Sequence, residues 1–445
     1  MLTLLPLLLA CTPKSPTVVL ISMDTTRADA LSVYGGPAQT PALQRLADRG
    51  LVAEWGLSQS ATTLASHTAV FSGLDPHRSG IVRNGYPLAE GYPLLQERFQ
   101  DKGWDSIAVV GSTALEPDMG LKRGFRVYED HGLRAVDKRY EVGADQVTQA
   151  ALKHLDAQDK PQPTLLFVHY YDPHTPWNSG PAERQAERCE SRPSALVGGD
   201  QQTALNLSDP NFLGQLKAND VQAAWCLYEA EIEWTDQQIG LLLDGLEERG
   251  RLKDALIIVF SDHGEHMGSP NGSPFGHGPD VDPDIIHVPL IFAGTGRFKG
   301  LRGRLDRQIR LMDLGPTILG LLQWPHTLGD GEDTSPILRG ETTWEAPPSF
   351  AEATQPAELQ HTKGWNNLLF QRSVTHSGFS YVRTPYLYSH ELFALAAPVR
   401  LIEDAQRMNS MNAQITAWDA QAPAFRPWQP TQQTVEALRA LGYLE

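Results

Sequence analysis

Acidic and imidazole side chains, which can bind a cation or transfer a proton, follow several apolar segments of this chain. In open α/β sheets, ligands bind at the carboxyl ends of the strands. A single aspartate at a strand end is weak evidence for a ligand-binding site, because aspartate often caps helices. Several polar residues at strand ends on one edge of the sheet do predict such a site. The groups concerned are Asp24, the trio His169, Asp172 and His174, the pair Asp262 and His263, and His277 in a glycine-rich loop.

The segments before these residues are short, apolar and rich in β-branched side chains, which is typical of buried strands. They cover residues 17–23, 105–111, 164–171, 254–261 and 287–293. Helical patterns lie at 41–49, which begins with proline, and at 228–249, which is followed by Gly250. This alternation predicts an α/β fold with a mostly parallel central sheet and helices on both faces. The shorter segments 368–374 and 379–382 predict a small C-terminal antiparallel sheet.

The length of 445 residues predicts more than one core. We expect a signal or lipoprotein segment with a linker at 1–16, a catalytic domain at 17–345 and a C-terminal annex at 346–445. The 37 basic and 53 acidic residues give a net charge of −16, which argues against nucleic-acid binding. A small anionic substrate is compatible with this charge, because a bound cation can reverse the field locally.

The N-terminus reads MLTLLPLLLACTPKSP and suggests an export signal. The run Leu2 to Ala10 is shorter than the roughly 20 residues that span a bilayer. The sequence Leu8-Leu9-Ala10-Cys11 resembles a lipobox, so we expect an exported protein, periplasmic or lipid-anchored to a bacterial membrane through Cys11. No Lys or Arg precedes the apolar run, which a misplaced start codon would explain. The alternative is a frayed apolar tail.

Cys189 and Cys226 are the two cysteines left after Cys11. In an oxidising compartment an even pair is compatible with a disulfide. Two separate thiols are the alternative, because Cys226 lies in an apolar context that simple core packing would explain.

Several motifs resemble the sulfatase branch of the alkaline phosphatase superfamily, and together they cover nearly the whole mature chain. The resemblance implies an alkaline phosphatase-like fold and a metal-dependent hydrolase of ester bonds. The motifs are VVLISMDTTRADAL (18–31), TPALQRLADRG (40–50), TTLASHTAVFSGLDPHRSG (62–80), HYYDPHTPW (169–177), FSDHGEH (260–266), MDLGPT (312–317) and ALGYL (440–444).

The nucleophile segment departs from the sulfatase pattern C-x-P-S-R, whose cysteine is oxidised to formylglycine. Thr63 stands at the cysteine position, Ala65 replaces the proline, and Ser66-His67 stand where Ser-Arg would be. Threonine cannot become formylglycine, but it is the nucleophile in phosphodiesterases and phosphoethanolamine transferases of the superfamily. The resemblance therefore implies phosphoryl rather than sulfuryl transfer, with Thr62 as the alternative nucleophile if the alignment is one residue off.

The metal ligands also differ from those of sulfatases, which carry two adjacent aspartates after the first strand and commonly Asp-Asn later. Here Asp24 is followed by Thr25, and Asp262 by His263. An imidazole in place of a carboxylate favours Zn²⁺ or Mn²⁺, with Ca²⁺ or Mg²⁺ as alternatives. We expect Asp24, Thr63, Asp262 and His263 to bind this divalent metal. The structural alternatives are a helix cap at Asp24 and a hydrogen-bonded pair at Asp262 and His263.

Four further residues have expected roles that stay open. His174 or His277 would protonate the leaving group, or the two would hold a second metal as in the transferase relatives. His67 would contact the metal-bound oxygen or only orient Ser66. Asn84 lies 21 residues after Thr63, where the family often uses an asparagine to hold a substrate oxygen, but Asn84-Gly85 is also a common turn pair.

The expected function is metal-dependent hydrolysis of phosphate monoesters or diesters through a covalent phospho-Thr63 intermediate. The expected partner is a small anionic ester. The alternatives are a sulfatase that works without formylglycine, a phosphoethanolamine-type transferase and a non-catalytic binding protein. The transferase relatives usually have several transmembrane helices, and we find none in this sequence.

Overall fold

The computed structural model of the chain describes residues 15–133, 141–189, 217–268, 275–325, 327–341, 345–354, 370–396 and 399–422. Residues 1–14 of the predicted export segment, Cys11 among them, lie outside these residues, as does the closing motif 440–444. Among the described helices, none has both the length and the apolar character needed to cross a membrane.

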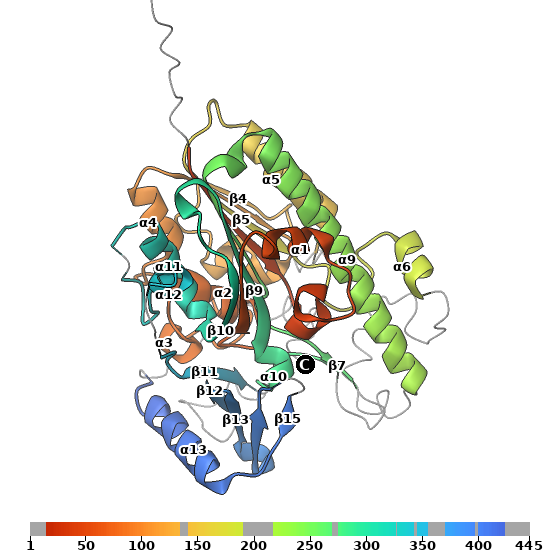
Figure 1. Cartoon of the computed structure of the whole chain (residues 1–445), viewed down its shortest axis with the longest axis vertical. Helices are drawn as coiled ribbons and strands as arrows, with labels where there is room; N and C mark the ends of the chain where they lie inside the picture. The colour runs from red at the N-terminus through yellow and green to blue at the C-terminus, as the bar shows by residue number, and fades with distance from the viewer. Residues whose placement is uncertain are drawn as a thin grey trace, which may run out of the picture.

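An eight-stranded sheet forms the centre of the larger part of the protein, in the order β10-β2-β9-β6-β1-β5-β3-β4 (Figure 1). Strand β9 runs antiparallel to β2 and β6, and the other neighbouring pairs are parallel. The predicted mostly parallel sheet is therefore confirmed. The strands are β1 Thr17–Met23, β2 Leu51–Leu57, β3 Asp105–Val110, β4 Val127–Glu129, β5 Thr164–Tyr170, β6 Ala255–Phe260, β9 His287–Gly294 and β10 Gly303–Arg310.

Helices cover both faces of this sheet, as predicted (Figure 1). Side chains alternate along β1, so that Val18 and Leu20 join one apolar core while Val19 and Ile21 join the other. The first core is closed by α2 Thr63–Ser72, α4 Leu95–Asp101 and α11 Leu314–Leu321. The second is closed by α1 Pro41–Ala47, α5 Ala144–Asp156 and α9 Ala218–Glu248. Shorter helices are α3 Pro76–Ser79, α6 Ala182–Cys189, α10 Pro283–Ile286 and α12 Ser335–Leu338.

Helix α9 is longer than its sequence pattern predicted. It begins at Ala218 rather than at residue 228, because Val221 and Ala224 are also buried against the core. The backbone N–H of Lys217 donates to the Asp220 carboxylate over 2.8 Å, which satisfies a donor at the helix start. The other end agrees with the prediction, since Gly250 has a left-handed φ of 67° directly after the helix.

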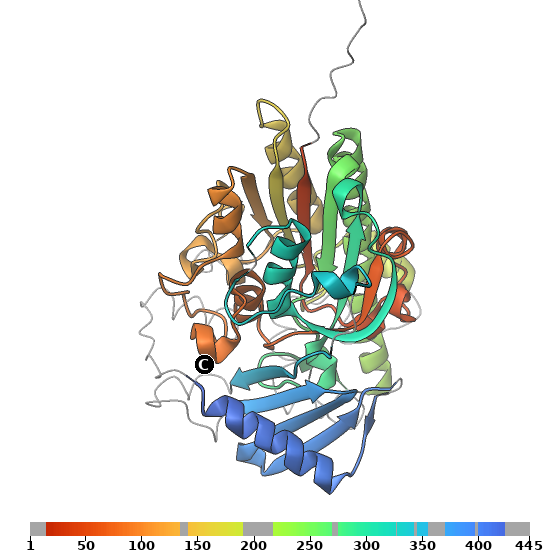
Figure 2. The ribbon, with the colours of Figure 1, turned by 60° about the vertical axis from the view of Figure 1, so that its left-hand side comes forward.

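A second, five-stranded sheet lies below the first in Figure 2, with one helix against it. All its pairs are antiparallel, which confirms the predicted C-terminal sheet. The backbone N–H of Glu352 in this sheet donates to the Gln59 carbonyl over 3.2 Å, so the sheet contacts the segment that leads into α2. Its elements are β11 Ser349–Thr354, β12 Phe370–His376, β13 Phe379–Thr384, β14 Ser389–Ala394, β15 Arg400–Leu401 and α13 Ala405–Asp419.

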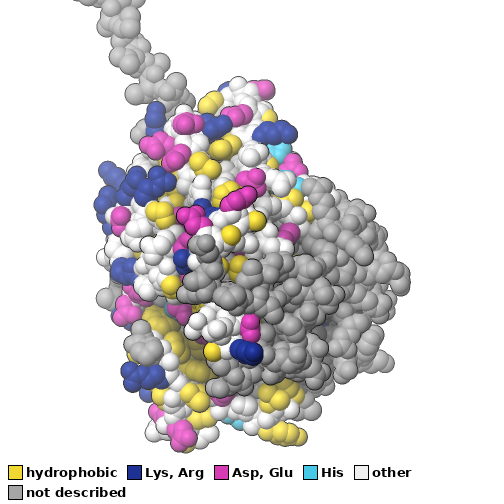
Figure 3. Space-filling view, turned by 90° about the vertical axis from the view of Figure 1, so that its right-hand side faces the viewer, with side chains coloured by type: hydrophobic (Ala, Val, Ile, Leu, Met, Phe, Trp, Pro, Cys, Tyr) yellow, Lys and Arg dark blue, Asp and Glu magenta, His cyan; other side chains and the backbone are white. Residues whose placement is uncertain are grey.

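The surface around the C-terminal sheet carries exposed apolar side chains, and such side chains are visible low on the face in Figure 3. A cavity of about 1020 Å³ lies between the two sheets and is lined by Trp55, Asp306 and Phe379, among others. None of the candidate site residues lines this cavity among the described residues. The size of this cavity therefore does not locate the predicted site. The site has to be located from the chemistry of its side chains.

Cys189 at the end of α6 and Cys226 in α9 form a disulfide, with their Cα atoms 5.9 Å apart. The alternative of two separate thiols is therefore excluded in this structure. The bond spans a sequence separation of 37 residues, so it restricts the unfolded chain.

We expect replacement of both Cys189 and Cys226 by serine to lower the free energy of unfolding by about 2–4 kcal/mol. The measurement is urea denaturation of wild type and double variant, each with and without reductant. Reductant should destabilise only the wild type. Equal midpoints for wild type and variant in oxidising buffer would show that the disulfide contributes nothing.

Candidate metal and active site

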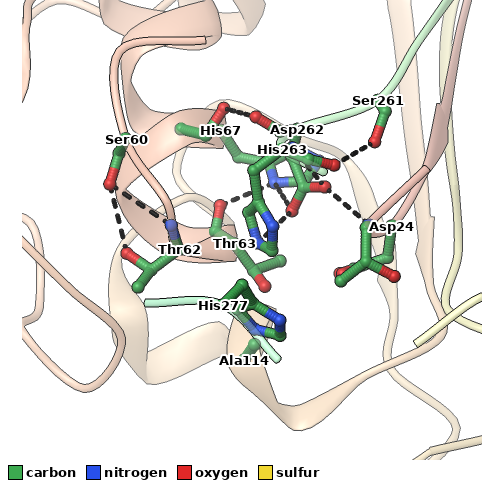
Figure 4. Close-up of polar contacts among 12 residues, drawn as sticks. Asp24, Ser60, Thr62, Thr63, His67, Ala114, Ser261, Asp262, His263 and His277 are labelled. Atoms are coloured by element: carbon green, nitrogen blue, oxygen red, sulfur yellow. Dashed lines mark hydrogen bonds and ion pairs between the residues drawn. The ribbon is translucent and has the colours of Figure 1, made fainter. Parts of the chain in front are cut away.

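Thr63 is the first residue of α2, a helix whose side chains are all buried. Thr62 precedes the helix in an extended conformation, and its Oγ1 lies 3.3 Å from Ser60 Oγ. Thr63 Oγ1 is buried and has no hydrogen-bond partner in the described part of the chain. In Figure 4, Thr62 turns toward Ser60, whereas Thr63 lies next to His263 and His277. The two adjacent threonines thus have different surroundings, and Thr63 faces the predicted ligands.

Asp24, Asp262 and His263 form a fully buried group whose ligand atoms all lie within 4.8 Å of one another. Asp24 follows β1, and Asp262 and His263 follow the neighbouring β6, as the sequence predicted. Asp24 caps no helix here, because the next helical turn is Ala28–Ala30 with Arg27 as its N-cap residue. The predicted alternative of a helix cap is therefore wrong.

One atom of each ligand candidate lacks a hydrogen-bond partner among the described residues. These atoms are Asp24 Oδ1, Asp262 Oδ2 and His263 Nε2, and they resemble Thr63 Oγ1 in this respect. Buried polar groups without partners are rare, because each costs about 1–3 kcal/mol. Four such atoms around one place make this group suited to binding a ligand.

The remaining atoms of these residues are held by neighbours. His169 Nε2 lies 2.9 Å from Asp24 Oδ2, to which it donates. Asp262 Oδ1 accepts from the backbone N–H groups of Thr25 and His263, at 3.2 and 2.9 Å. His263 Nδ1 lies 3.0 Å from the Gly264 carbonyl, so this nitrogen carries the proton and Nε2 presents a lone pair. Contacts of this kind orient metal ligands in proteins.

The pKa values of Asp24 and Asp262 also favour a positive charge between the two side chains. Burial and the neighbouring Asp262 raise the pKa of Asp24 well above its ordinary value. Burial opposes the ionisation of Asp262 too, but nearby His263 and His67 hold the pKa of Asp262 below its ordinary value. Two buried carboxylates this close repel each other unless a cation or proton separates them.

His67 lies inside the first turns of α2, and both of its ring nitrogens are engaged. Nδ1 contacts the Thr63 carbonyl at 2.7 Å, and Nε2 contacts Ser22 Oγ at 2.9 Å. Burial lowers the pKa of His67 to about 4, so the ring is neutral at neutral pH. Ser66 Oγ donates separately to the Asp262 carbonyl over 2.7 Å. These contacts join α2 to β1 and β6 beneath the ligand group.

His174 and His277 lie beside His263, with ring centroids 4.9 Å apart from each other and His277 4.4 Å from His263. His174 Nδ1 contacts the Thr175 carbonyl at 2.6 Å, and its buried Nε2 has no partner among the described residues. His277 Nδ1 lies 3.1 Å from Glu265 Oε1. Burial lowers the pKa of His174 to about 3 and that of His277 to about 4. The structure therefore brings both predicted histidines to the site.

Asn84 contacts the start of α2, where its Oδ1 accepts from the Leu64 N–H over 2.8 Å. Its Nδ2 is buried without a partner in the described chain, which leaves a donor for a substrate oxygen. Gly85 follows with a left-handed φ of 84°, as a turn requires. Asn84 therefore combines a turn position with a side chain at the site.

We expect Asn84→Ala to lower the free energy of unfolding by about 1 kcal/mol, because it leaves the Leu64 N–H without a partner. Asn84→Asp keeps the acceptor but loses the donor, so it should retain stability and raise KM for an anionic ester. Urea denaturation and steady-state kinetics measure the two effects. Unchanged KM in a folded Asn84→Asp protein would contradict the substrate contact.

Two residues of the site, His169 and Glu265, make contacts that the sequence did not predict. His169, at first sight a residue buried on a strand, donates to Asp24. Glu265 is buried beside His277, and burial raises its pKa to about 7. A histidine inside an otherwise apolar strand was the one signal for His169, and it could not show which carboxylate the ring would meet.

Three carboxyls lie near the start of the loop that carries His174: Asp172 and Glu231, which are buried, and Glu141, which is partly buried. Asp172 Oδ1 accepts from the Ala144 N–H and Glu231 Oε2 from the Gly180 N–H, both over 2.9 Å. Burial, and then their mutual repulsion, raises the pKa of Asp172 to about 7 and that of Glu231 to about 8. Burial alone does most of this for Glu141, whose pKa is raised to about 7. The cluster is therefore protonated in part at neutral pH.

We expect the protein to lose stability as pH rises from about 4.5, the ordinary pKa of glutamate, to the raised value of about 8 at Glu231. In this window the unfolded chain has already lost the proton that the folded protein retains, so folding becomes less favourable. Glu231→Gln should raise the melting temperature at pH 8.5 by a few degrees and change it little at pH 5. The exposed Glu248→Gln on the same helix is the control. Parallel pH profiles for wild type and Glu231→Gln would refute this.

Comparisons with known proteins agree with the fold and with the predicted family. The sulfatase family model matches residues 16–324, which is more than half of the chain. An ulvan-active sulfatase of Formosa agariphila is 25% identical over 84% of this chain and 73% of its own length. An arylsulfatase of Clostridium perfringens is 23% identical over 68% of this chain and 74% of its own.

Solved structures show the same fold at lower identity. The phosphonate monoester hydrolase of Agrobacterium radiobacter has a TM-score of 0.71 at 20% identity, over 92% of this chain and 96% of its own. A protein in complex with its substrate D-glucosamine-2-N,6-O-disulfate has a TM-score of 0.72 at 17% identity, over 93% and 99%. The fold is thus alkaline phosphatase-like, and the alternative of a non-catalytic binding protein is not supported. This protein belongs to the sulfatase family and is a hydrolase of ester bonds.

Proposed function

We propose that this protein hydrolyses phosphate monoesters or diesters through a covalent phospho-Thr63 intermediate. The observation that carries the proposal is the set of four buried atoms that make no hydrogen bond in the described chain: Thr63 Oγ1, Asp24 Oδ1, Asp262 Oδ2 and His263 Nε2. A hydroxyl among two carboxylates and an imidazole is the arrangement in which a cation can activate an alcohol as a nucleophile.

Enzymes of the sulfatase family use a divalent metal, and the described residues offer suitable ligands. Asp24, Asp262, His263 and Thr63 would hold it, and the mixed oxygen and nitrogen donors favour Zn²⁺ or Mn²⁺ over Ca²⁺ or Mg²⁺. When bound, such a cation lowers the pKa of a hydroxyl beside it and attracts an anionic substrate oxygen. His174 and His277 are the ligands we would assign to a second cation, if one binds.

The positions of Thr63, His174 and His277 suggest the role of each residue in the proposed reaction. Thr63 Oγ gives its proton to one of the neutral rings of His174 and His277 and attacks phosphorus, so an Oγ–P bond forms while the bond to the leaving alcohol breaks. His174 or His277 gives the leaving oxygen a proton. Both rings are neutral without substrate, and an anionic ester beside them raises their pKa because it stabilises the imidazolium. Water then gives a proton to the same pair of rings and attacks phosphorus, so the Oγ–P bond breaks, phosphate is released and Thr63 Oγ regains its proton. His67 acts as a positioning residue, since it holds the first turn of α2 against β1.

Sulfate ester hydrolysis is the second candidate function, because the curated relatives are named sulfatases. Formylglycine hydrate has a second hydroxyl that can expel sulfate without attack on sulfur. Thr63 lacks this hydroxyl, so we expect sulfate turnover to be slower than phosphate turnover. A transferase, in which an acceptor alcohol replaces water, is a third candidate.

The test is a comparison of nitrophenyl phosphate, bis-nitrophenyl phosphate and nitrophenyl sulfate with the metal-loaded enzyme, with and without an added acceptor alcohol. We expect kcat/KM for one of the phosphate esters to exceed that for the sulfate by at least tenfold, about 1.4 kcal/mol in the barrier. A higher kcat/KM for the sulfate would overturn the phosphate proposal in favour of the sulfatase. Product that carries the acceptor would favour the transferase.

We also propose that residues 1–16 direct export and that Cys11 is acylated, which would give periplasmic or lipid-anchored protein. The catalytic domain would then be 17–345 and the annex 346–445. The intact mass of the exported protein tests the first point, because cleavage before Cys11 and acylation change the mass in opposite directions. An unprocessed mass would contradict it.

A further inference from the structure

A second cluster of possible metal ligands lies outside the group just described. His266 belongs to the short strand β7 His266–Met267, which pairs with β8 Phe275–Gly276, and Asp280 and Asp282 follow β8. The ligand atoms of these three residues all lie within 4.8 Å of one another. We propose that His266, Asp280 and Asp282 bind a divalent cation of the Zn²⁺ or Mn²⁺ type that stabilises the β7–β8 hairpin.

The donor set fits such a cation. One imidazole and two carboxylates give mixed nitrogen and oxygen ligands, which suit Zn²⁺ and Mn²⁺ better than Ca²⁺. His266 Nε2 and Asp280 Oδ1 already face each other at 2.7 Å. Asp282 Oδ1 is buried and has no hydrogen-bond partner within the described residues. This oxygen is the second, independent sign of a missing ligand, because a buried carboxylate oxygen needs a donor or a cation.

The surrounding charge favours a cation as well. Asp284 and Glu391 act on Asp282 with further negative charge, and His266 is the principal positive group that opposes them there. Arg27, the other nearby cation, is engaged by Asp284 at 3.1 Å and by Asp29 at 2.7 Å. The side chains of His266 and Asp280 are each 16% exposed, so a cation can reach them from solvent.

A cation at this site would stabilise the hairpin and thereby the positions of Glu265 and His277, which adjoin it in the chain. The hairpin begins directly after Glu265 and ends directly before His277, which contact each other. Val281, between the two aspartates, packs with Ala351 and Ala353 of β11, and its N–H donates to the Gln371 side chain. The bound cation would therefore fasten the hairpin to the C-terminal sheet. This inference does not depend on the identity of the nucleophile or of the substrate.

The experiment is metal analysis of the full chain, stripped with chelator and then dialysed against Zn²⁺ or, separately, Mn²⁺ at pH 8. Against the effect of burial, Asp280 raises the pKa of His266 to about 9, so the cation has to displace a proton from this ring when it binds. Mass spectrometry of the metal gives equivalents per chain. Asp282→Asn and His266→Gln should each hold one equivalent less than wild type. Asp284→Asn, a neighbouring carboxylate outside the trio, is the matched control and should hold as much as wild type. Circular dichroism checks that each variant is folded.

The variant Asp262→Asn separates this site from the proposed catalytic one. It should retain an equivalent that disappears in the double variant Asp262→Asn/Asp282→Asn. Zn²⁺ should also raise the melting temperature of Asp262→Asn, and this shift should vanish in the double variant. Equal metal content in wild type and both folded trio variants would overturn the second site. If instead wild type and Asp262→Asn bound equal metal while Asp282→Asn lost one equivalent, the second site would stand and the proposed catalytic metal would fail.

Discussion

Replacing Thr63 by alanine is expected to reduce kcat/KM by on the order of 10⁴-fold or more, because removal of a nucleophile usually costs most of the catalysis. The fold should tolerate the change, since the Thr63 hydroxyl makes no hydrogen bond to the described residues that would be lost. Steady-state kinetics on the best phosphate ester and thermal unfolding measure the two effects.

Thr62→Ala is the matched control, because it removes the same atoms one residue earlier. Thr62 Oγ1 faces Ser60 Oγ at 3.3 Å, away from the ligand group, so kcat/KM should change less than tenfold. Thr63→Ser should retain measurable turnover, because serine keeps the hydroxyl. If Thr62→Ala were the inactive variant and Thr63→Ala the active one, the nucleophile would be Thr62.

Loss of the Asp262 carboxylate is expected to have the second largest effect. Asp262→Asn removes a negative charge from the group that would hold the cation, so metal content should fall by one equivalent. The accompanying loss in kcat/KM should be at least about 10²–10³-fold, the usual effect of one electrostatic group that acts in the transition state. Asp254→Asn is the control, because Asp254 lies at the other end of β6 and pairs with Arg297 at 2.9 Å. Its activity and metal content should match wild type.

Removal of the metal by a chelator should abolish activity in the same way, without any mutation. Enzyme stripped of metal should be inactive, and added Zn²⁺ or Mn²⁺ should restore turnover better than Ca²⁺ or Mg²⁺, because His263 supplies a nitrogen ligand. Full activity in the stripped enzyme would contradict the proposed metal chemistry. Restoration by Ca²⁺ alone would leave a metal site but contradict its assignment to the Zn²⁺ class.

The two sets of variants also test each other. Thr63→Ala should bind nearly as much metal as wild type, since Asp24, Asp262 and His263 remain. Asp262→Asn should lose one equivalent of metal together with most of its activity. A Thr63→Ala protein that lost all metal would mean that its low activity reports ligand loss rather than the missing nucleophile.

The strands at the centre of the fold were predictable because their local sequence is sufficient to identify a buried strand. The β1, β5 and β6 segments are continuous β-branched and apolar runs, buried on both faces of a parallel sheet. Strands β2, β4 and β10 of this sheet were not predicted. Five of the eight residues in the β10 sequence GRLDRQIR are charged or amide side chains, and its first five residues are mostly exposed. Its strand conformation depends on pairing with β2, which local pattern does not show.

The sequence by itself determined which residue types stand at the strand ends, and hence that Asp24, Asp262 and His263 would gather at one sheet edge. Parallel strands make this inference possible, because their carboxyl ends must meet. Tertiary structure alone decided which atoms remain without partners, that His169 meets Asp24, and that Thr63 rather than Thr62 faces the ligand group. The physical reason is that one residue at a helix start turns a side chain by about 100°. A hydrogen bond between residues 145 apart in the chain, such as His169 to Asp24, exists only once the sheet has formed.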